Sequence, residues 1–233
     1  MEAGFDFEGG TERGSAFAPW NARAKRGSSA ARPWRPPLGT RKAEGLRAGR
    51  TRPEKSNPTS IRLSGPIEHD SIVNGPGLRA VIWTQGCPNH CEGCQNPETW
   101  DFNGGVLIDI EEVKEELKKL KGQTGLTFCG GEPFVQPAAC LELAKFAHKE
   151  LGWDVWSFSG FTYEEIKAYS EAKTDDEAQS AKNRATLDFL NELDALIDGR
   201  FVLAERDLTL KFRGSRNQRI LHLKNGQITS IEQ

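Results

Sequence analysis

LRAVIWTQGCPNHCEGC, residues 78–94, joins an apolar run to a loop that carries three cysteines. The first part, Leu78 to Thr84, is rich in β-branched and aromatic side chains and predicts a buried β-strand. The second part holds Cys87, Cys91 and Cys94 in the spacing C-x3-C-x2-C. Thiolates this close can turn inward from one loop onto a single metal centre. The stretch therefore predicts a strand with a metal-binding loop at its carboxyl end.

Beyond this stretch, short apolar runs alternate with amphipathic ones. The runs that predict further strands are Gly125 to Cys129, Trp153 to Phe158 and Ala195 to Ile197. Helices are expected over Ile110 to Leu120, over Ala138 to Glu150, after Thr162, and around Leu187, Leu190 and Leu193. Strands that alternate with helices in this way predict an α/β fold with a parallel sheet.

Two local details of the helices can also be predicted. Asp109 is expected to cap the first helix, with Glu112 completing a capping box. The polar segment from Lys173 to Asn183 is expected to be a surface loop between the third and fourth helices.

Each glycine- or cysteine-rich segment comes directly after a predicted strand. These segments are Gly86 to Cys94, Gly130 to Pro133, Ser159-Gly160 and Asp198-Gly199. In an α/β barrel or an open α/β sheet, the loops after the strands gather at one edge, where such folds place their active sites. We therefore expect the four segments to converge.

Residues 1–60 differ in composition from residues 61–233, which are expected to form the folded domain. They contain no Val and no Ile, and they hold twelve of the 31 basic residues against six of the 33 acidic ones. Such a segment cannot bury enough apolar area to offset its ordering entropy. We expect a disordered basic tail rich in Gly, Ala, Arg and Pro, or upstream sequence included by a wrong choice of start codon.

Composition also limits the compartment. The chain has no run of about 18 apolar residues and no secretory signal layout, so neither a membrane span nor export is expected. Five cysteines without an export signal favour metal or redox chemistry over a disulfide framework. The lysines of residues 114–121 predict a solvated helix face, and no nucleic-acid partner is expected. The expected location is the cytoplasm.

The kind of metal centre is left open by the residues alone. A tetrahedral zinc site needs a fourth ligand, which His90 could supply only by bending back within a tight loop. Cys129 ends a strand and Cys140 lies on the expected buried side of a helix, so neither completes the set convincingly. Three thiolates on a four-iron cluster would leave one iron open to a small molecule.

Cys-x3-Cys-x2-Cys followed one βα unit later by Gly130-Gly131-Glu132-Pro133 resembles the radical S-adenosylmethionine (SAM) enzymes. Further segments resemble, within that superfamily, the activating proteins of anaerobic (class III) ribonucleoside-triphosphate reductase. They are Ile72 to Arg79, Asn96 to Trp100, Ser159 to Thr162, Ile197 to Gly199 and Arg213 to Gln218. The resemblance covers roughly Ser71 to Leu221 and implies a partial, open βα barrel.

The resemblance also implies cofactors and their ligands. Cys87, Cys91 and Cys94 would hold a [4Fe-4S] cluster, and the open iron would bind SAM. The residues implied in contacts with SAM or the cluster are Gly93, Cys94, Gln95, Gly130, Gly131, Glu132 and Ser159. Among these, the two adjacent glycines would let the backbone approach the methionine moiety, Glu132 or nearby carbonyls would face its ammonium, and Ser159 would lie near the ribose.

By the same resemblance, reductive cleavage of SAM would generate a glycyl radical on the large subunit of the reductase. A low-potential donor such as flavodoxin would supply the electron. Two related alternatives keep the chemistry: an activase of another glycyl radical enzyme, of the pyruvate formate-lyase type, and an enzyme like 7-carboxy-7-deazaguanine synthase. An alternative of another class is a non-catalytic Cys3His zinc or electron-transfer module. The Arg213 to Gln218 segment is either structural or a docking surface.

Overall fold

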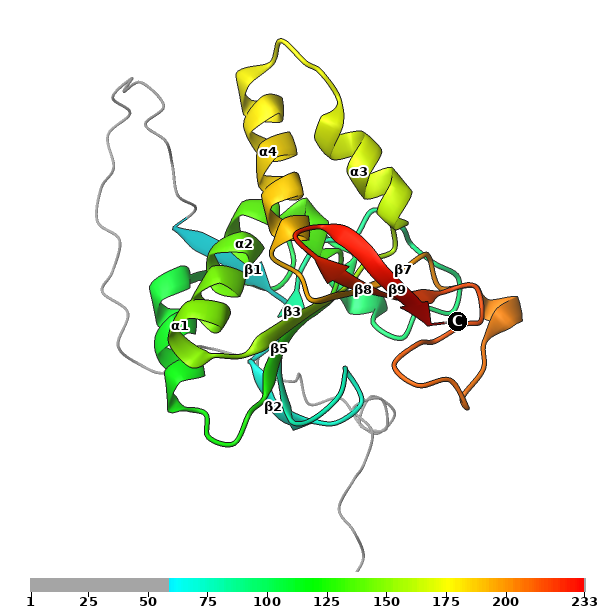
Figure 1. The fold of residues 1–233 in the computed structure, drawn as a ribbon, viewed down its shortest axis with the longest axis horizontal. Helices are drawn as coiled ribbons and strands as arrows, with labels where there is room; N and C mark the ends of the chain where they lie inside the picture. The colour runs from blue at the N-terminus through cyan, green and yellow to red at the C-terminus, as the bar shows by residue number, and fades with distance from the viewer. Residues whose placement is uncertain (1–58, 233) are drawn as a thin grey trace, which may run out of the picture. The chain divides into compact units, whose positions relative to one another are not determined.

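A central set of parallel strands organises the computed structural model, which describes residues 59–232 (Figure 1). The neighbours are, in order, β3 (Arg79–Thr84), β5 (Gly125–Gly130), β6 (Asp154–Phe158) and β7 (Ala195–Asp198). Each matches a predicted strand to within one residue at either end. The α/β fold is thereby confirmed. Except for its last two residues, the tail predicted for residues 1–60 lies outside the described residues.

The strands that flank this set are antiparallel, so the predicted parallel sheet is correct only for its centre. They are β1 (Ser60–Leu63), β2 (Glu68–Ser71), β4 (Val106–Asp109), β8 (Arg219–Lys224) and β9 (Gln227–Glu232). The full order is β4-β1-β3-β5-β6-β7-β8-β9, with β2 paired to β3 outside this path. Strands β4 and β9 end the sheet, which is therefore open.

The flanking strands escaped prediction because most are short and carry few apolar residues. β2, for example, is Glu-His-Asp-Ser. The β8–β9 hairpin did have a signal, because Asn225-Gly226 connects its strands. Both residues have positive φ, 49° and 68°, as a two-residue hairpin turn of type I′ requires.

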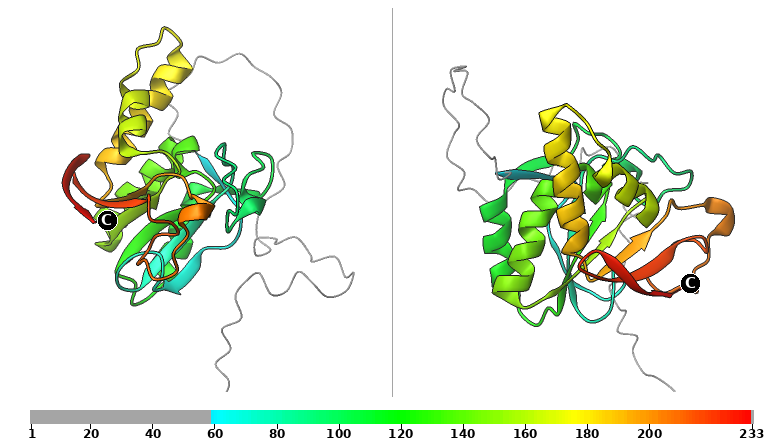
Figure 2. Two further views of the ribbon diagram at one scale, coloured as in Figure 1. Left: turned by 90° about the vertical axis from the view of Figure 1, so that its right-hand side faces the viewer. Right: turned by 45° about the horizontal axis from the view of Figure 1, so that its top comes forward.

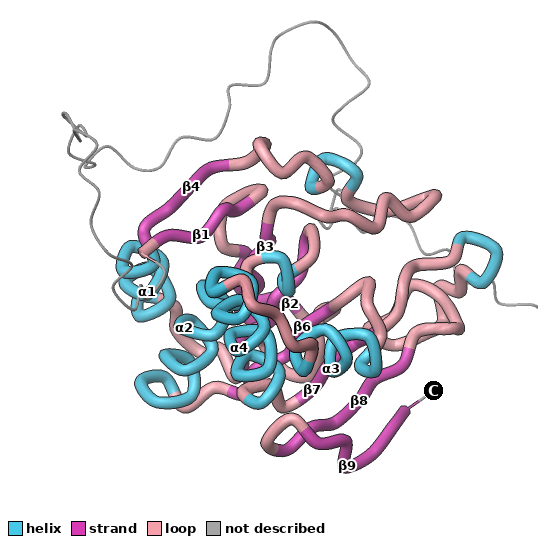
Figure 3. The backbone as a smooth tube through the Cα atoms, turned by 90° about the horizontal axis from the view of Figure 1, so that it is seen from above, coloured by secondary structure: helices cyan, strands magenta, loops and turns pink. Residues whose placement is uncertain are grey.

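Helices α1 (Ile110–Lys119), α2 (Pro137–Phe146) and α4 (Glu177–Asn191) pack side by side along one face of the sheet. The right-hand view of Figure 2 shows them in front of the strands, with α2 in the middle. Helix α3 (Tyr163–Glu171) packs against α4 (Figure 3). No helix in residues 59–232 combines the length and apolar character that a membrane span requires.

Two local predictions about the helices are only partly correct. Asp109 does cap α1, but its carboxylate accepts from the Glu111 N–H, one residue before the Glu112 position that a capping box uses. Such a box forms instead at Thr162 and Glu165, at the start of α3. The expected loop from Lys173 to Asn183 ends early, since α4 begins at Glu177.

The early start of α4 has a clear physical cause. The Asp176 side chain accepts from the Gln179 N–H and caps the helix. One turn further on, the buried Asn183 side chain donates to the Ala172 carbonyl at 2.8 Å and fastens α4 to the end of α3. The first turns of α4, Glu-Ala-Gln-Ser-Ala-Lys-Asn-Arg, contain no large apolar residue, so the sequence shows no apolar period there.

At the edge where the parallel strands begin, a fully buried arginine ties three of them together. Arg79 on β3 donates through Nε to Thr127 Oγ1 on β5 at 2.6 Å. Its Nη1 reaches both carboxylate oxygens of Asp154 on β6, at 3.0 and 3.1 Å. Desolvation lowers the pKa of Arg79, and the attraction of Asp154 opposes that shift. The opposite edge is where the cysteines lie.

Candidate cluster and SAM site

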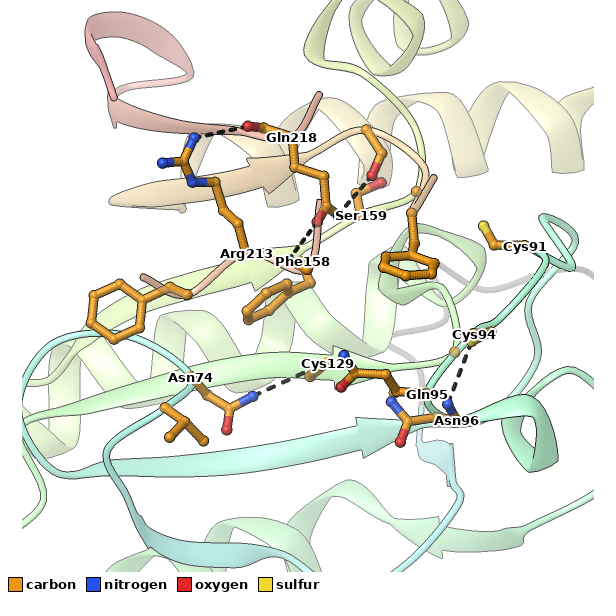
Figure 4. Close-up of a pocket in the computed structure, with 18 of the residues that line it drawn as sticks. Asn74, Cys91, Cys94, Gln95, Asn96, Cys129, Phe158, Ser159, Arg213 and Gln218 are labelled. Atoms are coloured by element: carbon orange, nitrogen blue, oxygen red, sulfur yellow. Dashed lines mark hydrogen bonds between the residues drawn. The ribbon is translucent and has the colours of Figure 1, made fainter. Parts of the chain in front are cut away.

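The four segments expected to converge do converge, around a cavity of about 630 Å³ beyond the carboxyl ends of β3, β5, β6 and β7 (Figure 4). Its lining includes Cys87, Asn89, Cys91, Cys94 and Gln95 from the first segment, Gly130 and Gly131 from the second, Ser159 and Gly160 from the third, and Gly199 from the fourth. The volume lies within the usual range for small-molecule sites. This convergence confirms the prediction drawn from the position of each segment after a strand.

The three clustered cysteines are free and half-buried, and all face this cavity. Their loop is attached at its start, where Gly86 N–H donates to Thr99 O at 2.8 Å and Cys87 N–H to Trp100 O at 3.2 Å. At its other end Asn96 N–H donates to Cys94 Sγ at 3.4 Å. Backbone N–H groups directed at sulfur stabilise thiolates and tune cluster potentials.

The thiols are not arranged around a single ion. Among the described residues, no three His, Cys, Asp or Glu side chains lie close enough to hold one metal ion. His90, the only histidine in the loop, instead stacks on Trp100 with 4.9 Å between ring centroids. A zinc site needs all its ligands within about 2.3 Å of the same ion. A cubane cluster suits this donor set better, because each thiolate binds a different iron.

The other two cysteines do not complete the set. Cys140 is fully buried in α2, and its thiol donates to the Pro133 carbonyl at 3.6 Å. Cys129, at the end of β5, lines the cavity, but burial raises its pKa to about 12 and keeps it a neutral thiol. Burial also raises the pKa of Cys87, although Cys87 is half-exposed.

Gly130 and Gly131 join the turn after β5 to the start of the cysteine loop. Gly131 N–H donates to Thr84 O at 2.8 Å, and Glu132 N–H donates to Gly86 O at 2.9 Å. A Cβ on Gly131 would lie 2.5 Å from Gly86 O, and one on Gly130 would lie 2.7 Å from Thr84 O. Gly130 also has a φ of +97°. Glycine is thus required here for backbone packing alone, whatever ligand the turn faces.

The Glu132 carboxylate is fully buried and turned into the protein. It accepts from Gly160 N at 2.8 Å, from Ser159 Oγ at 3.0 Å, from Phe134 N at 3.1 Å and from Asn89 Nδ2 at 3.4 Å. Desolvation raises its pKa to about 7 in spite of these bonds. Glu132 is not among the residues that line the cavity. The carbonyls of its turn are therefore better placed than its carboxylate to meet a ligand ammonium.

The remaining predicted contacts lie around the cavity in different ways. Ser159 lines it, while its hydroxyl donates to Glu132 and accepts from Phe161 N–H at 3.0 Å. Gln95 is exposed and lines the cavity. Gly93 is exposed, with a φ of +72°, and is not part of the lining. Their contacts with SAM remain predictions.

Sequence reasoning missed Leu210, Lys211 and Phe212 among the lining residues. Asn74 and Arg213 had been named only within longer segments, before β3 and before β8. Asn74, buried at 8% exposure, is held by Ser71 Oγ at 2.7 Å. Arg213 lines the cavity from the opposite side (Figure 4). Its Nη1 donates to the Gln218 carbonyl at 3.1 Å. The Arg213 to Gln218 segment had been singled out as either structural or a docking surface.

Gln218 itself has a structural role. Its side-chain oxygen accepts from Gly214 N–H at 2.8 Å and from Ser215 N–H at 3.2 Å, while its Nε2 donates to Gly199 O at 3.0 Å. The side chain thus closes the turn before β8 and connects it to the end of β7. Arg213, Gly214 and Gln218 are the members of the segment that line the cavity.

Comparison with known proteins agrees with this site. Residues 73–221 match a family described as a 4Fe-4S single cluster domain. The anaerobic ribonucleoside-triphosphate reductase-activating protein of Haemophilus influenzae is 33% identical over 160 residues, which are 65% of this chain and 91% of that protein. The protein of the same name from Enterobacteria phage T4 is 33% identical over 160 residues, 64% of this chain and 86% of its own length.

A further protein of this name, from Escherichia coli K12, is 28% identical over 167 residues, which are 66% of this chain and 94% of that protein. A crystal structure of QueE from Escherichia coli aligns with a TM-score of 0.35 and 16% identity, over 44% of this chain and 53% of that one, a likeness too weak to bear on the fold. The matched cluster domain and the length of each relative that is covered lead to one conclusion. The chain belongs to the family of anaerobic ribonucleoside-triphosphate reductase-activating proteins.

Proposed function

We propose that this protein is a radical SAM activating enzyme that generates a glycyl radical on the large subunit of anaerobic ribonucleoside-triphosphate reductase. The observation that carries the proposal is the convergence of three free cysteines with the Gly130-Gly131 turn and Ser159 around one cavity. The names of the relatives indicate the reductase as the target. We also propose a cytoplasmic location, in line with the sequence analysis.

The protein's own residues would divide the work between holding a cluster and holding SAM. Cys87, Cys91 and Cys94 would each bind one iron of a [4Fe-4S] cluster through a thiolate. When bound, such a cluster supplies one electron to SAM, whose cleavage gives methionine and the deoxyadenosyl radical that removes a hydrogen from a glycine Cα. The backbone of Gly130 and Gly131 would orient the methionine end, and Ser159, at the next strand end, would contact the ribose.

The openness of the site supports a protein substrate. The cavity opens beyond the strand ends, and its rim carries exposed apolar side chains, Ile72 and Val73, each 67% exposed. A loop of a partner protein could reach the site and exclude water from it. Reductive cleavage also needs a low-potential electron donor, and a flavodoxin is the donor class that we propose.

Three other functions remain as outcomes to be tested. An activase of a different glycyl radical enzyme, or an enzyme like 7-carboxy-7-deazaguanine synthase, would use the same cluster and SAM chemistry on another substrate. A Cys3His zinc module is disfavoured by His90, which stacks on Trp100 away from a shared ion site. Iron content and the identity of the radical acceptor separate these possibilities.

The test uses the full chain, reconstituted anaerobically with iron and sulfide, beside the variants Cys91→Ala and Cys140→Ala. Cys140 is a matched control, because it is a cysteine outside the cavity. With SAM and dithionite, we expect 5′-deoxyadenosine from the wild type and from Cys140→Ala, and none from Cys91→Ala. Adding the reductase large subunit should give a glycyl radical signal in electron paramagnetic resonance. Bound zinc with no SAM cleavage in any protein would contradict the proposal.

A further inference from the structure

Asn89, between the first two cysteines, contacts both loops that follow β5 and β6. Its Nδ2 donates to Glu132 Oε2 at 3.4 Å. The same amide end packs against Gly160, where an added Cβ would lie 2.9 Å from Asn89 Cγ and closer still to Nδ2. Among the described residues, no other side chain of the cysteine loop, residues 86–95, hydrogen-bonds to these two loops. Asn89 therefore provides the side-chain link between them and the cysteine loop, beside the backbone hydrogen bond from Glu132 N–H to Gly86 O.

The orientation of the Asn89 amide follows from its partner. Carboxylate oxygens accept hydrogen bonds, so the amide nitrogen must face Glu132 and the amide oxygen must face away. That oxygen, Asn89 Oδ1, is buried without a hydrogen-bond partner among the described residues. The side chain thus keeps one bond to Glu132 while its other polar end stays unpaired.

Glu132 is a rigid anchor for this link. Its carboxylate is fully buried and is held from three further directions by Ser159 Oγ, Gly160 N–H and Phe134 N–H. A side chain fixed in this way has little freedom to follow a moving loop. Whatever bonds to it is therefore fixed relative to β5 and β6.

We infer that Asn89 is a positioning residue, which holds the three-cysteine loop against the loop after β6 through the buried Glu132 carboxylate. The inference rests on the proposed function, because the object to be positioned is a cluster facing SAM. The cysteines determine whether a cluster binds, and Asn89 determines where it faces. Four residues donate hydrogen bonds to the Glu132 carboxylate, and the bond from Asn89, at 3.4 Å, is the longest. Bonds of this kind often tighten only when the ligand complex forms.

The first test compares Asn89→Ala with Glu92→Ala, a change at an exposed residue of the same loop. Each full-length protein is reconstituted anaerobically, its iron is counted, and SAM is titrated against the resonance spectrum of the reduced cluster. For Asn89→Ala we expect a normal iron content and a half-maximal SAM concentration raised roughly tenfold, the usual size for lost outer contacts of a metal site. Glu92→Ala should match the wild type. A SAM curve for Asn89→Ala within about twofold of the wild type would overturn the inference.

A second test reverses the pair. Asn89→Asp sets two carboxylates against each other and should weaken SAM binding more than Asn89→Ala does. The double variant Asn89→Asp with Glu132→Gln restores one amide and one carboxylate in the opposite order. It should recover part of the affinity that Asn89→Asp loses. If the double variant binds SAM no better than Asn89→Asp alone, the link through Glu132 is wrong.

A third measurement separates this inference from the proposed function. The wild type, Asn89→Asp, Glu132→Gln and the double variant are unfolded in urea without metal. Shifts in the midpoint that do not add up support a direct contact between the two side chains, whereas additive shifts overturn it. If the shifts are non-additive but the wild type takes up no iron, the proposed function fails, and with it the positioning role, while the contact remains.

Discussion

The two ends of the parallel strands β3, β5 and β6 differ in how completely their polar groups are paired. Where the strands begin, every nitrogen of the buried Arg79 side chain is hydrogen-bonded, to side chains and to backbone carbonyls. Where they end, three thiols face a cavity. The buried side-chain polar atoms that lack a partner among the described residues are Asn89 Oδ1, Trp100 Nε1 and Arg213 Nε, all in loops beyond the strand ends. The fully paired arginine and the cavity thus occupy opposite edges of one sheet.

The difference shows how one sheet can combine a fully hydrogen-bonded edge, which stabilises the fold, with an edge that leaves thiols accessible. Native proteins pair nearly all their buried polar groups. Unpaired ones therefore mark places where stability is lower than it could be, as at ligand-binding sites. Substitutions at the two edges should therefore have different signatures. At the first edge they should lower the free energy of unfolding. At the second, loss of a half-buried cavity thiol should remove chemistry and leave stability nearly unchanged, whereas changes at the closely packed Gly131 and Glu132 should also affect stability.

The largest effect on stability is expected for Arg79→Ala. The change removes the ion pair with Asp154 and the bond to Thr127 Oγ1, and leaves buried groups unpaired. Breaking a buried ion pair from one side typically costs about 3–5 kcal/mol, and because the Asp154 side chain is 38% exposed we expect a cost near the lower end, about 3 kcal/mol. Urea unfolding of the metal-free chain would measure the loss of unfolding free energy. The control is Lys118→Ala, which breaks an exposed ion pair and should change that free energy by less than about 1 kcal/mol. A loss for Arg79→Ala no larger than for the control would remove the contrast between the two edges.

Glu132 should give stability a pH dependence at the functional edge. Desolvation raises its folded pKa from 4.5 to about 7, so the native state binds this proton more tightly than the unfolded chain does. Its contribution is fully present below about pH 4.5 and is lost as pH rises through about 7, by about 3 kcal/mol in total. We expect Glu132→Gln to flatten this part of the pH profile of unfolding. Equal slopes in both proteins would show that another group is responsible.

Gly131→Ala should have an intermediate effect. The added Cβ would meet the Gly86 carbonyl oxygen at 2.5 Å, and that oxygen belongs to backbone that cannot move freely. Overpacking of this kind typically costs about 1–3 kcal/mol. The metal-free protein is the right sample, because a loss of stability there cannot come from a ligand. If Gly131→Ala is as stable as the wild type, this glycine is not needed for packing, and its role is to let a ligand approach the backbone.

The smallest effect on stability is expected for Cys91→Ser. The side chain is half-buried, and it makes no hydrogen bond in the described structure. Without metal, its midpoint should stay within about 0.5 kcal/mol of the wild type, as for other substitutions away from packed features. The same variant should lose its cluster. A marked loss of metal-free stability would mean that the thiol supports the loop, and it would weaken the division between the two edges.

Much of this organisation was accessible from residue patterns. The four central strands are apolar runs that need burial on both faces, so their composition identifies them. The convergence of the loops follows from the direction of parallel strands. Among the antiparallel strands at the margins, β2 was missed because it is polar, and β1 has only two apolar residues. Strands of that kind depend on their neighbours for stability.

The site divides in the same way. Cysteine spacing and the Gly-Gly-Glu-Pro turn identified the lining of one side of the cavity, because a short loop limits where its side chains can go. Leu210, Lys211 and Phe212 approach from a loop far away in sequence, and no local pattern predicts them. The direction of the Glu132 side chain was equally hidden, since it depends on where Ser159 and Gly160 lie.

By itself, the sequence determined the α/β class, the order of the central elements and the cysteine-bearing loop. These depend on periodicity and on contacts between residues close in the chain. Only the tertiary structure decided that Arg79 is buried as a paired charge, that Glu132 faces inward and that Asn89 reaches it. Each of these outcomes needs partners from different strands, and a side chain's burial and hydrogen bonds are determined only once those strands are assembled.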